Sequence, residues 1–120
     1  MLVAALLVLA IALPGASHAQ GCDVVRLESD FASGDLRGTA PADGMACFDL
    51  RVPQGQNLSI ELESGRNVSI SVPGYYDARN DRMFLGDVPG PLEIRVFQLM
   101  RAAAPEQFAV RIRFEDAGTR

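Results

Sequence analysis

Histidine is almost absent from this chain of 120 residues: the single one, His18, lies in an N-terminal apolar segment. Outside that segment no imidazole is present for acid–base work, for a serine or cysteine triad, or for a zinc site. Lysine and tryptophan are also missing, and eleven arginines face fifteen acids, for a formal net charge of −4. Nucleic-acid binding requires a basic face, which dispersed arginines in an acidic chain do not supply. We therefore expect no nucleic-acid partner and no histidine chemistry.

Long apolar runs are scarce as well, because only residues 2–13 form one, and it is too short to anchor the chain across a bilayer. A Pro-Gly break follows the run, and the small residues Ser17 and Ala19 stand three places and one place before an expected cut after Ala19. This order is typical of a secretory signal peptide. We predict that residues 1–19 are removed, that residues 20–120 form one domain, and that the protein is periplasmic or secreted.

Two cysteines remain, Cys22 and Cys47. An exported chain meets oxidising conditions, so a disulfide between them is the expected arrangement, with two buried free thiols as the alternative. Closing a loop of this length stabilises a fold by roughly 3 kcal/mol on a chain-entropy estimate. We predict that the bond fastens the N-terminal segment to the strand that carries Phe48.

Helical periodicity is missing outside the signal peptide, and short runs of alternating apolar and polar residues take its place. Half-buried strands at this spacing form an antiparallel sandwich or barrel, and we predict an all-β, antiparallel β-sandwich of about eight strands. The strands at residues 24–27 and 35–38 have the weakest patterns. The positions expected to point inward are Phe48, Leu50, Val52, Leu58, Ile60, Leu62, Val68, Ile70, Val72, Leu92, Ile94, Val96, Phe108, Val110, Ile112 and Phe114.

Two connections between strands are candidates for a binding surface. Residues 73–83 read as one long loop that holds both tyrosines, and loops of this length in small domains are often functional. Residues 93–114 read as a hairpin whose tip, residues 100–106, carries a single cation. Tyrosine and arginine are frequent in binding hot spots. The alternative to a binding role is that a tyrosine packs over the end of the core as a lid and that the arginine is a solvated loop charge. The predicted partner-binding residues are Arg101, Met100, Tyr75 and Tyr76.

The acidic residues give little support to an enzyme. A glycosidase needs two carboxylates at a fixed separation, one of them in an apolar setting that raises its pKa. The strand acids all fall on outward positions, where water solvates the charge, and we therefore predict a protein without catalytic activity. The residues concerned are Asp49, Glu61, Glu63, Glu93 and Glu115.

Acids in the turns raise the question of calcium, which takes six to eight oxygen ligands. Their spacing matches no calcium loop, and arginines stand among them, so ordinary turn chemistry is the simpler interpretation and we expect no metal and no cofactor. The residues are Asp77, Asn80, Asp81 and Asp87. Asn57 and Asn67 match the N-glycosylation sequon, but each asparagine opens a strand, where turn formation explains it.

Several segments taken in order carry a family resemblance: FASGDLRG, FDLRVPQGQNLSIELES, NVSISVPG and PLEIRVFQLMRAAAPEQFAVRIRF. Together they resemble exported bacterial domains similar to periplasmic inhibitors of goose-type (g-type) lysozyme, and they also look like prepeptidase C-terminal β-sandwich domains. The resemblance covers residues 24–114. Its most specific piece is IRVFQLMRAAA, which is similar to the family's Ile-Arg-Val-Tyr-x-Met-Arg followed by small residues.

The resemblance implies an antiparallel sandwich that offers an arginine-bearing loop to the acidic cleft of a lysozyme. Arg101 stands at the matching position, and residues 102–104 are small enough to enter a narrow groove. The chain departs from the family at Pro105, where a second basic residue is common, and at Leu92, where a tyrosine is usual. The expected function is thus that of an exported, lysozyme-inhibitor-like monomer or weak dimer. The alternative is a non-catalytic carbohydrate-binding or structural module of the cell envelope.

Overall fold

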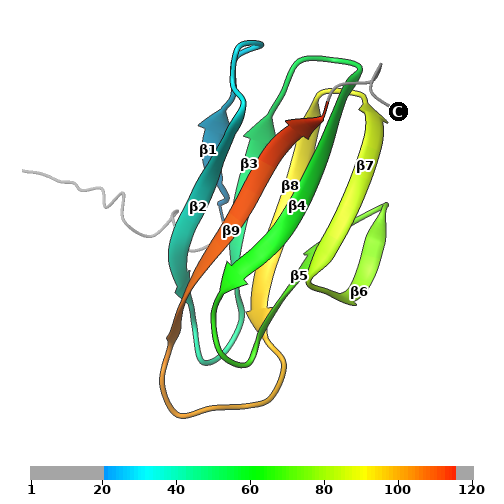
Figure 1. The fold of residues 1–120 in the computed structure, drawn as a ribbon. Helices are drawn as coiled ribbons and strands as arrows, with labels where there is room; N and C mark the ends of the chain where they lie inside the picture. The colour runs from blue at the N-terminus through cyan, green and yellow to red at the C-terminus, as the bar shows by residue number, and fades with distance from the viewer. Residues whose placement is uncertain (1–20, 116–120) are drawn as a thin grey trace, which may run out of the picture.

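The computed structural model describes residues 21–115, without the side chains of residues 76–80, and contains nine strands in that part of the chain (Figure 1). They are β1 (Asp23–Arg26), β2 (Ser33–Ala40), β3 (Met45–Arg51), β4 (Gln56–Ser64), β5 (Val68–Val72), β6 (Tyr76–Asn80), β7 (Arg82–Val88), β8 (Pro91–Gln98) and β9 (Glu106–Glu115). A search of the same residues for a helix long and apolar enough to cross a membrane finds none. The predicted signal peptide lies outside the described residues.

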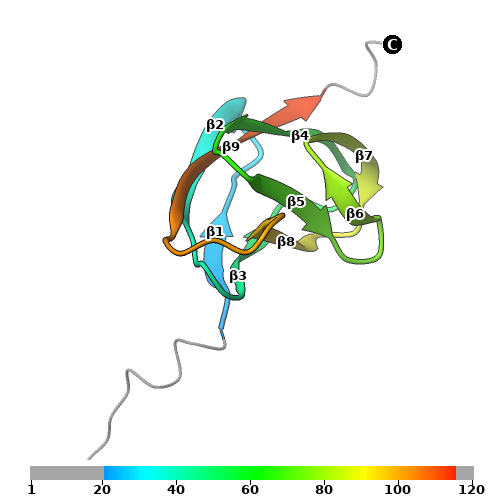
Figure 2. The same ribbon diagram turned by 90° about the horizontal axis from the view of Figure 1, so that it is seen from below.

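The strands form two sheets that pack face to face, as the view along the strands shows (Figure 2). One sheet has the order β1-β3-β8-β5-β6, and the other has the order β2-β9-β4-β7. Neighbouring strands run antiparallel, except that β1 lies parallel to β3. The predicted all-β sandwich is therefore confirmed, with nine strands in place of about eight.

The core lies between the sheets and is built from the alternating apolar residues. Of the sixteen positions expected to point inward, all but Leu62 and Phe114 are buried, and these two pack half-buried against the same cluster. Leu62 stands beside a register shift between β4 and β9, where the ladder is irregular. Alternation places one face of each strand against the facing sheet, and the hydrophobic effect then stabilises the sandwich.

The predicted hairpin of residues 93–114 is wrong. β8 pairs with β3 and β5, whereas β9 pairs with β2 and β4, so the two strands belong to different sheets. Residues 99–105 therefore cross from one sheet to the other at the end of the sandwich (Figure 2). Alternation in a sequence shows which side chains face the core, but it does not show which strands exchange hydrogen bonds, and a connection of this length suits either arrangement.

The predicted long loop of residues 73–83 is also wrong, because most of it is strand. β6 pairs with β5 through Ile70 with Asn80 and Val72 with Tyr76, and β7 begins at Arg82. The connection is reduced to a turn at residues 73–75. The sequence of β6, YDARN, has no alternating apolar residues, which is why its pattern predicts a loop.

The predicted disulfide between Cys22 and Cys47 is confirmed, and it joins the chain just before β1 to β3. The next residue along each segment continues the contact, because Asp23 pairs with Phe48 in the parallel ladder. At the other end of β1 the Leu27 amide donates to the Arg51 carbonyl oxygen over 2.9 Å. The N-terminal segment is thus fastened to β3, as the sequence predicts.

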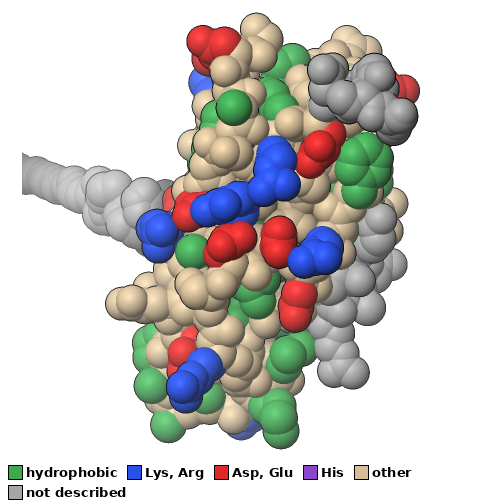
Figure 3. Space-filling view, viewed as in Figure 1, with side chains coloured by type: hydrophobic (Ala, Val, Ile, Leu, Met, Phe, Trp, Pro, Cys, Tyr) green, Lys and Arg blue, Asp and Glu red, His purple; other side chains and the backbone are tan. Residues whose placement is uncertain are grey.

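A row of alternating charges crosses the outer face of the four-stranded sheet, where Figure 3 shows basic and acidic side chains side by side. Its members follow the register: Asp35 pairs with Arg111, Arg111 with Glu61, and Glu61 with Arg82. The ion pairs Arg111–Asp35 and Arg82–Glu61 measure 3.0 and 3.1 Å. The hydrogen bond to Asp35 raises the pKa of Arg111 above its usual value. These arginines are committed to neighbours within the sheet.

Candidate partner-binding site at the loop end

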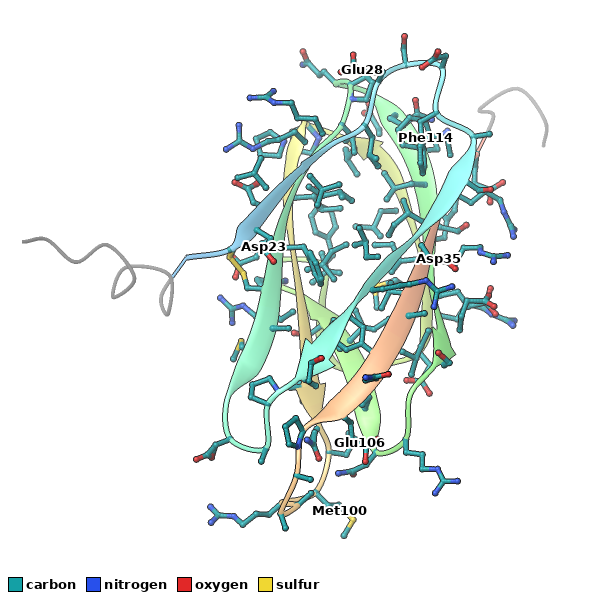
Figure 4. The ribbon with its side chains drawn as sticks, turned by 90° about the vertical axis from the view of Figure 1, so that its left-hand side faces the viewer. Asp23, Glu28, Asp35, Met100, Glu106 and Phe114 are labelled. Carbon is teal, nitrogen blue, oxygen red and sulfur yellow. A yellow bond between two sulfur atoms is a disulfide. The ribbon has the colours of Figure 1, made fainter. Side chains whose placement is uncertain are left out.

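Three connections lie together at one end of the sandwich, and we call this surface the loop end: residues 41–44, 65–67 and 99–105. The strand register brings them together, because Ala40 pairs with Glu106 in one sheet and Val68 pairs with Gln98 in the other. Figure 4 shows Met100 at the extreme of this end. Loops held by a rigid scaffold are frequent sites of recognition in sandwich folds.

Gln98, the last residue of β8, ties two of these loops together. Its Nε2 lies within hydrogen-bond distance of three carbonyl oxygens, those of Ala40 and Pro41 at 3.2 Å each and that of Ala104 at 3.0 Å. Ala40 ends β2, and Ala104 lies near the end of the 99–105 connection. One amide group therefore joins the 99–105 connection to the end of β2.

Asn67 ties in the third loop. Its backbone adopts φ of 59°, a left-handed conformation in which asparagine is one of the few tolerated residues. Its Oδ1 accepts from the Met100 amide at 2.9 Å, and its Nδ2 donates to the Met100 carbonyl oxygen at 2.7 Å and to Gln98 Oε1 at 3.0 Å. Its own carbonyl oxygen accepts from the Leu99 amide at 2.8 Å. The start of the 99–105 connection is therefore fixed to the β4–β5 turn.

Apolar side chains are exposed at the loop end. Met100 is 69% exposed and Leu99 42%, and Met45, which begins β3 directly after the 41–44 connection, is 48% exposed. Exposed apolar side chains that gather at one end of a fold favour a contact surface there.

Two arginines, Arg66 and Arg101, stand exposed on the same end. Among the side chains that the structure describes, no carboxylate forms an ion pair with either guanidinium, in contrast to the five arginines that form ion pairs on the sheet faces. The loop end also contains one acid, Asp43, which is exposed. The surface is therefore basic and apolar on a chain whose net charge is −4.

The structure places Tyr75 apart from Arg101. Tyr75 is 45% exposed in the turn between β5 and β6, at the lateral edge of the five-stranded sheet. That turn follows Val72, which lies four residues beyond Val68 along β5, about 13 Å from the loop end at roughly 3.3 Å per residue. The side chain of Tyr76 is outside the described residues. Arg101 and Met100 thus lie together, whereas Tyr75 lies to the side.

The strand acids lie on the outer sheet faces, and most of them bind a neighbour. Asp49 pairs with Arg51 at 2.8 Å, and Glu93 pairs with Arg95 at 2.7 Å. The hydrogen bond from Arg51 lowers the pKa of Asp49, which is opposite to the shift that a general acid requires. Glu115 accepts from the Ser59 hydroxyl at 2.9 Å. Asp49 and Glu93 lie opposite each other across the β3–β8 ladder, and each forms an ion pair with an arginine of its own strand.

Of the turn acids, Asp81 and Asp87 have side chains that the structure describes, and these two lie apart. Asp81 precedes β7 and accepts from the Ser69 hydroxyl at 3.2 Å, while Asp87 lies near the other end of β7, beside Asn57. The length of a strand separates them. The side chains of Asp77 and Asn80 are outside the described residues. A cluster of Cys22, Cys47 and Glu93 has suitable metal ligands, but its sulfur atoms are bonded to each other.

A shallow hollow of about 420 Å³ opens at the opposite end, near Glu28 and Phe114 in Figure 4. Its polar side chains are largely engaged within the protein: Gln56 donates to the carbonyl oxygens of Asn57 and Glu115, and Asn57 accepts from a backbone amide. A binding pocket presents convergent polar groups to a ligand. The loop end is the better candidate, because its arginines and apolar side chains are exposed, and its arginines form no ion pair among the described side chains.

Sequence reasoning missed several residues of the loop end. The sequence predicts that Asn67 is a turn former, and the structure places it in the β4–β5 turn, but no pattern indicates that its side chain reaches Met100. Gln98 carries no sequence signal, because a polar residue at a strand end is ordinary. Met45, Leu99 and Arg66 stand next to turns, and their grouping depends on the sheet topology.

Comparison with known proteins identifies the fold. No family model matches the sequence, and no curated protein matches it. Among solved structures, the chain is similar to PliG of Aeromonas hydrophila, a periplasmic lysozyme inhibitor of g-type lysozyme, with a TM-score of 0.57 and 17% identity. It is also similar to PliG of Salmonella Typhimurium, with a TM-score of 0.55 and 17% identity, and to a mutant PliG of Escherichia coli, with 0.54 and 16%.

Each of these matches covers 79% of this chain and 100% of the other chain. The match therefore extends over the whole sandwich of each inhibitor. At this level of identity the likeness shows a shared fold, which is the fold that the sequence resemblance implies.

Proposed function

We propose that this protein is an exported, non-catalytic binding protein that inhibits a lysozyme of the g-type by inserting the 99–105 connection into the enzyme's acidic cleft. Arg101 and Met100 are the central contact residues. The observation that carries the proposal is an exposed guanidinium without an ion pair among the described residues, on a connection whose base is fixed by hydrogen bonds.

The chemistry of the loop end supports this target. A lysozyme cleft holds catalytic carboxylates, and a guanidinium matches a carboxylate with two parallel hydrogen bonds. Residues 102–104 are alanines, which keep the connection narrow beside the arginine. Met100 is 69% exposed and offers flexible apolar surface to the wall of a cleft. The combination favours an acidic groove over a flat partner.

The fold and the disulfide support the same proposal. The three inhibitors described above share the two-sheet sandwich, and their names place them in the periplasm. A disulfide between Cys22 and Cys47 suits an oxidising compartment of this kind. Three of the five strand acids, Asp49, Glu61 and Glu93, pair with arginines on the sheet faces, which suits a protein that binds without catalysis.

A turbidity assay tests the proposal. The protein beginning at Gln20 is added to g-type, chicken-type and invertebrate-type lysozymes acting on a bacterial cell suspension, and calorimetry measures binding directly. We expect inhibition of the g-type enzyme and complex formation at equal stoichiometry. Unchanged lysis together with no binding to any of the three enzymes would overturn the proposal. Binding of soluble peptidoglycan fragments instead would favour the carbohydrate-binding alternative.

Tyr75 and Tyr76 are proposed as peripheral contacts on the side of the same footprint. Tyr75→Ala is expected to weaken lysozyme binding by less than about fivefold, because a rim residue removes little water from the contact. Surface plasmon resonance measures the effect, with Phe84→Ala as the control, since Phe84 is an aromatic residue that is 51% exposed on the four-stranded sheet. A Tyr75 loss as large as that of Arg101→Ala would contradict this peripheral placement.

A further inference from the structure

We infer that Asn67 and Gln98 are positioning residues that hold the three connections of the loop end as one preformed recognition surface. Neither residue is assigned a contact with the partner. Their role is to keep Met100 and Arg101 in the binding geometry before the partner arrives. The inference rests on the proposed function for the identity of the partner, but the preformed state is a property of the free protein and is testable without one.

The pairing of Asn67 with Met100 is the strongest evidence. The asparagine amide bonds both the N–H and the C=O of the same residue, at 2.9 and 2.7 Å, as a neighbouring strand would. The left-handed backbone at Asn67 directs the side chain from the β4–β5 turn, whose Gly65 also has a positive φ, of 141°. A side chain at Gly65 would meet Phe108 Cβ at 3.2 Å, so the turn is closely packed.

Gln98 supplies the second anchor. Its Nε2 reaches the carbonyl oxygen of Ala104 on the returning side of the connection, and its Oε1 accepts from Asn67. Among the described residues, the hydrogen bonds that residues 99–105 receive from outside the connection come from these two side chains and from the Asn67 backbone. The connection is thus fastened at both ends, while its centre stays free to enter a partner.

Preorganisation matters because a run of alanines, of which Ala103 and Ala104 are exposed, has small side chains that form few contacts of their own. Without anchors, only a fraction of the molecules would hold the binding conformation at any moment, and apparent affinity falls in proportion to that fraction. Ordering a loop during association also costs conformational entropy, which a preformed loop has already lost. Asn67 and Gln98 therefore act on affinity through the conformation of residues 99–105.

The first test is amide hydrogen exchange in the free protein. Asn67→Gly keeps the left-handed backbone accessible and removes the side chain. We expect exchange of the Met100 amide to accelerate by at least about tenfold, while the amide of Ile94 in the centre of β8 is unchanged. Asn67→Asp keeps an oxygen acceptor for this amide, so its exchange should stay within about threefold of wild type. Equal Met100 exchange in Asn67→Gly and wild type would overturn the inference.

Asn57→Gly is the matched control. Asn57 Oδ1 accepts from the Asp87 amide at 2.7 Å at the far end of the sandwich, and Asp87 has a positive φ of 53°. This variant removes a comparable bond between a side chain and the backbone without touching the loop end. We expect the larger decrease in melting temperature from Asn57→Gly, because Asn57 lies within β4 and glycine weakens a strand, but faster Met100 exchange in Asn67→Gly alone.

Binding kinetics against a g-type lysozyme form the second test. Asn67→Gly and Gln98→Met should each lower the association rate by about tenfold with a smaller effect on dissociation, because fewer molecules are competent to bind. In an Arg101→Ala background, Asn67→Gly should lower the association rate by a similar factor, because the fraction of competent molecules does not depend on the Arg101 contact. A loss that lies mainly in the dissociation rate would overturn the positioning role, since it would assign Asn67 a contact of its own.

The two tests separate this inference from the proposed function. If wild type binds no lysozyme, the proposed function fails, and hydrogen exchange alone decides whether the loop end is preformed. If wild type binds but Asn67→Gly leaves both Met100 exchange and the association rate unchanged, the proposed function stands and the positioning role fails.

Discussion

Replacing Arg101 with alanine is expected to weaken binding to a g-type lysozyme by about 2 kcal/mol or more, which corresponds to about 30-fold in the dissociation constant. Arg101 is exposed at the centre of the 99–105 connection and has no ion pair among the described residues, so its guanidinium is available to a partner. In an enclosed acidic cleft it would lose water and gain charged hydrogen bonds, which are roughly twice as strong as neutral ones. Isothermal titration calorimetry measures the loss.

Arg101→Lys separates charge from geometry. A lysine keeps the positive charge but cannot form two parallel hydrogen bonds with one carboxylate, so it should recover only part of the loss. Recovery to wild-type affinity would show that net charge, rather than the planar guanidinium, attracts the enzyme.

The control for Arg101→Ala requires an arginine outside the loop end. Arg111 lies on the four-stranded sheet, but its bond to Asp35 means that removing it also disturbs the charged row. Arg113, two residues further along β9, is exposed and has no ion pair within the described residues, so Arg113→Ala is the cleaner control. Equal losses from Arg101→Ala and Arg113→Ala would indicate general electrostatic attraction, and full retention by Arg101→Ala would remove the 99–105 connection from the site.

The core was largely predictable from the sequence because burial in a strand follows a period of two. Leu50, Ile60 and Ile94 stand at alternating positions and are fully buried. The pattern failed at β5, where Ser69 and Ser71 occupy expected outward positions but are buried as well. β5 lies inside its sheet beside β8, and the Ser69 hydroxyl bonds Asp81 from the β6–β7 turn. Burial of a strand residue by another segment depends on the tertiary structure, which the alternation of residues along one strand does not indicate.

The candidate site is predictable only in part. Its exposed contact residues can be recognised in the sequence, whereas the residues that position them depend on the strand order. Arg101 and Met100 were recognisable from the bare segment between two strands and from the family resemblance. The anchors were not, since the partner of the Asn67 side chain is 33 residues away in the chain. The strand order brings these segments together, and a sequence with correct alternation leaves that order open. The same gap explains why β8 and β9 were predicted to form a hairpin.

Removing the disulfide is expected to lower the free energy of unfolding by about 3 kcal/mol, because the bond closes a chain segment with a sequence separation of 25. The Cys22→Ser/Cys47→Ser double variant tests this by urea denaturation with both thiols absent. β1 has only four residues and an exposed Val24, so few buried contacts hold it to β3. We therefore expect the amides of the β1–β3 ladder to lose protection from hydrogen exchange first.

Wild-type protein treated with dithiothreitol provides the matched comparison, because it loses the same bond but keeps both sulfur atoms. The two preparations should unfold at the same urea concentration, which would assign the loss to the cross-link rather than to the serines. Lysozyme binding should change by less than about threefold in either one, since Gln98 and Asn67 fix the loop end from β8 and the β4–β5 turn rather than from β1. Stability of the double variant within about 0.5 kcal/mol of wild type would mean that the pairing of β1 with β3 is sufficient without the cross-link.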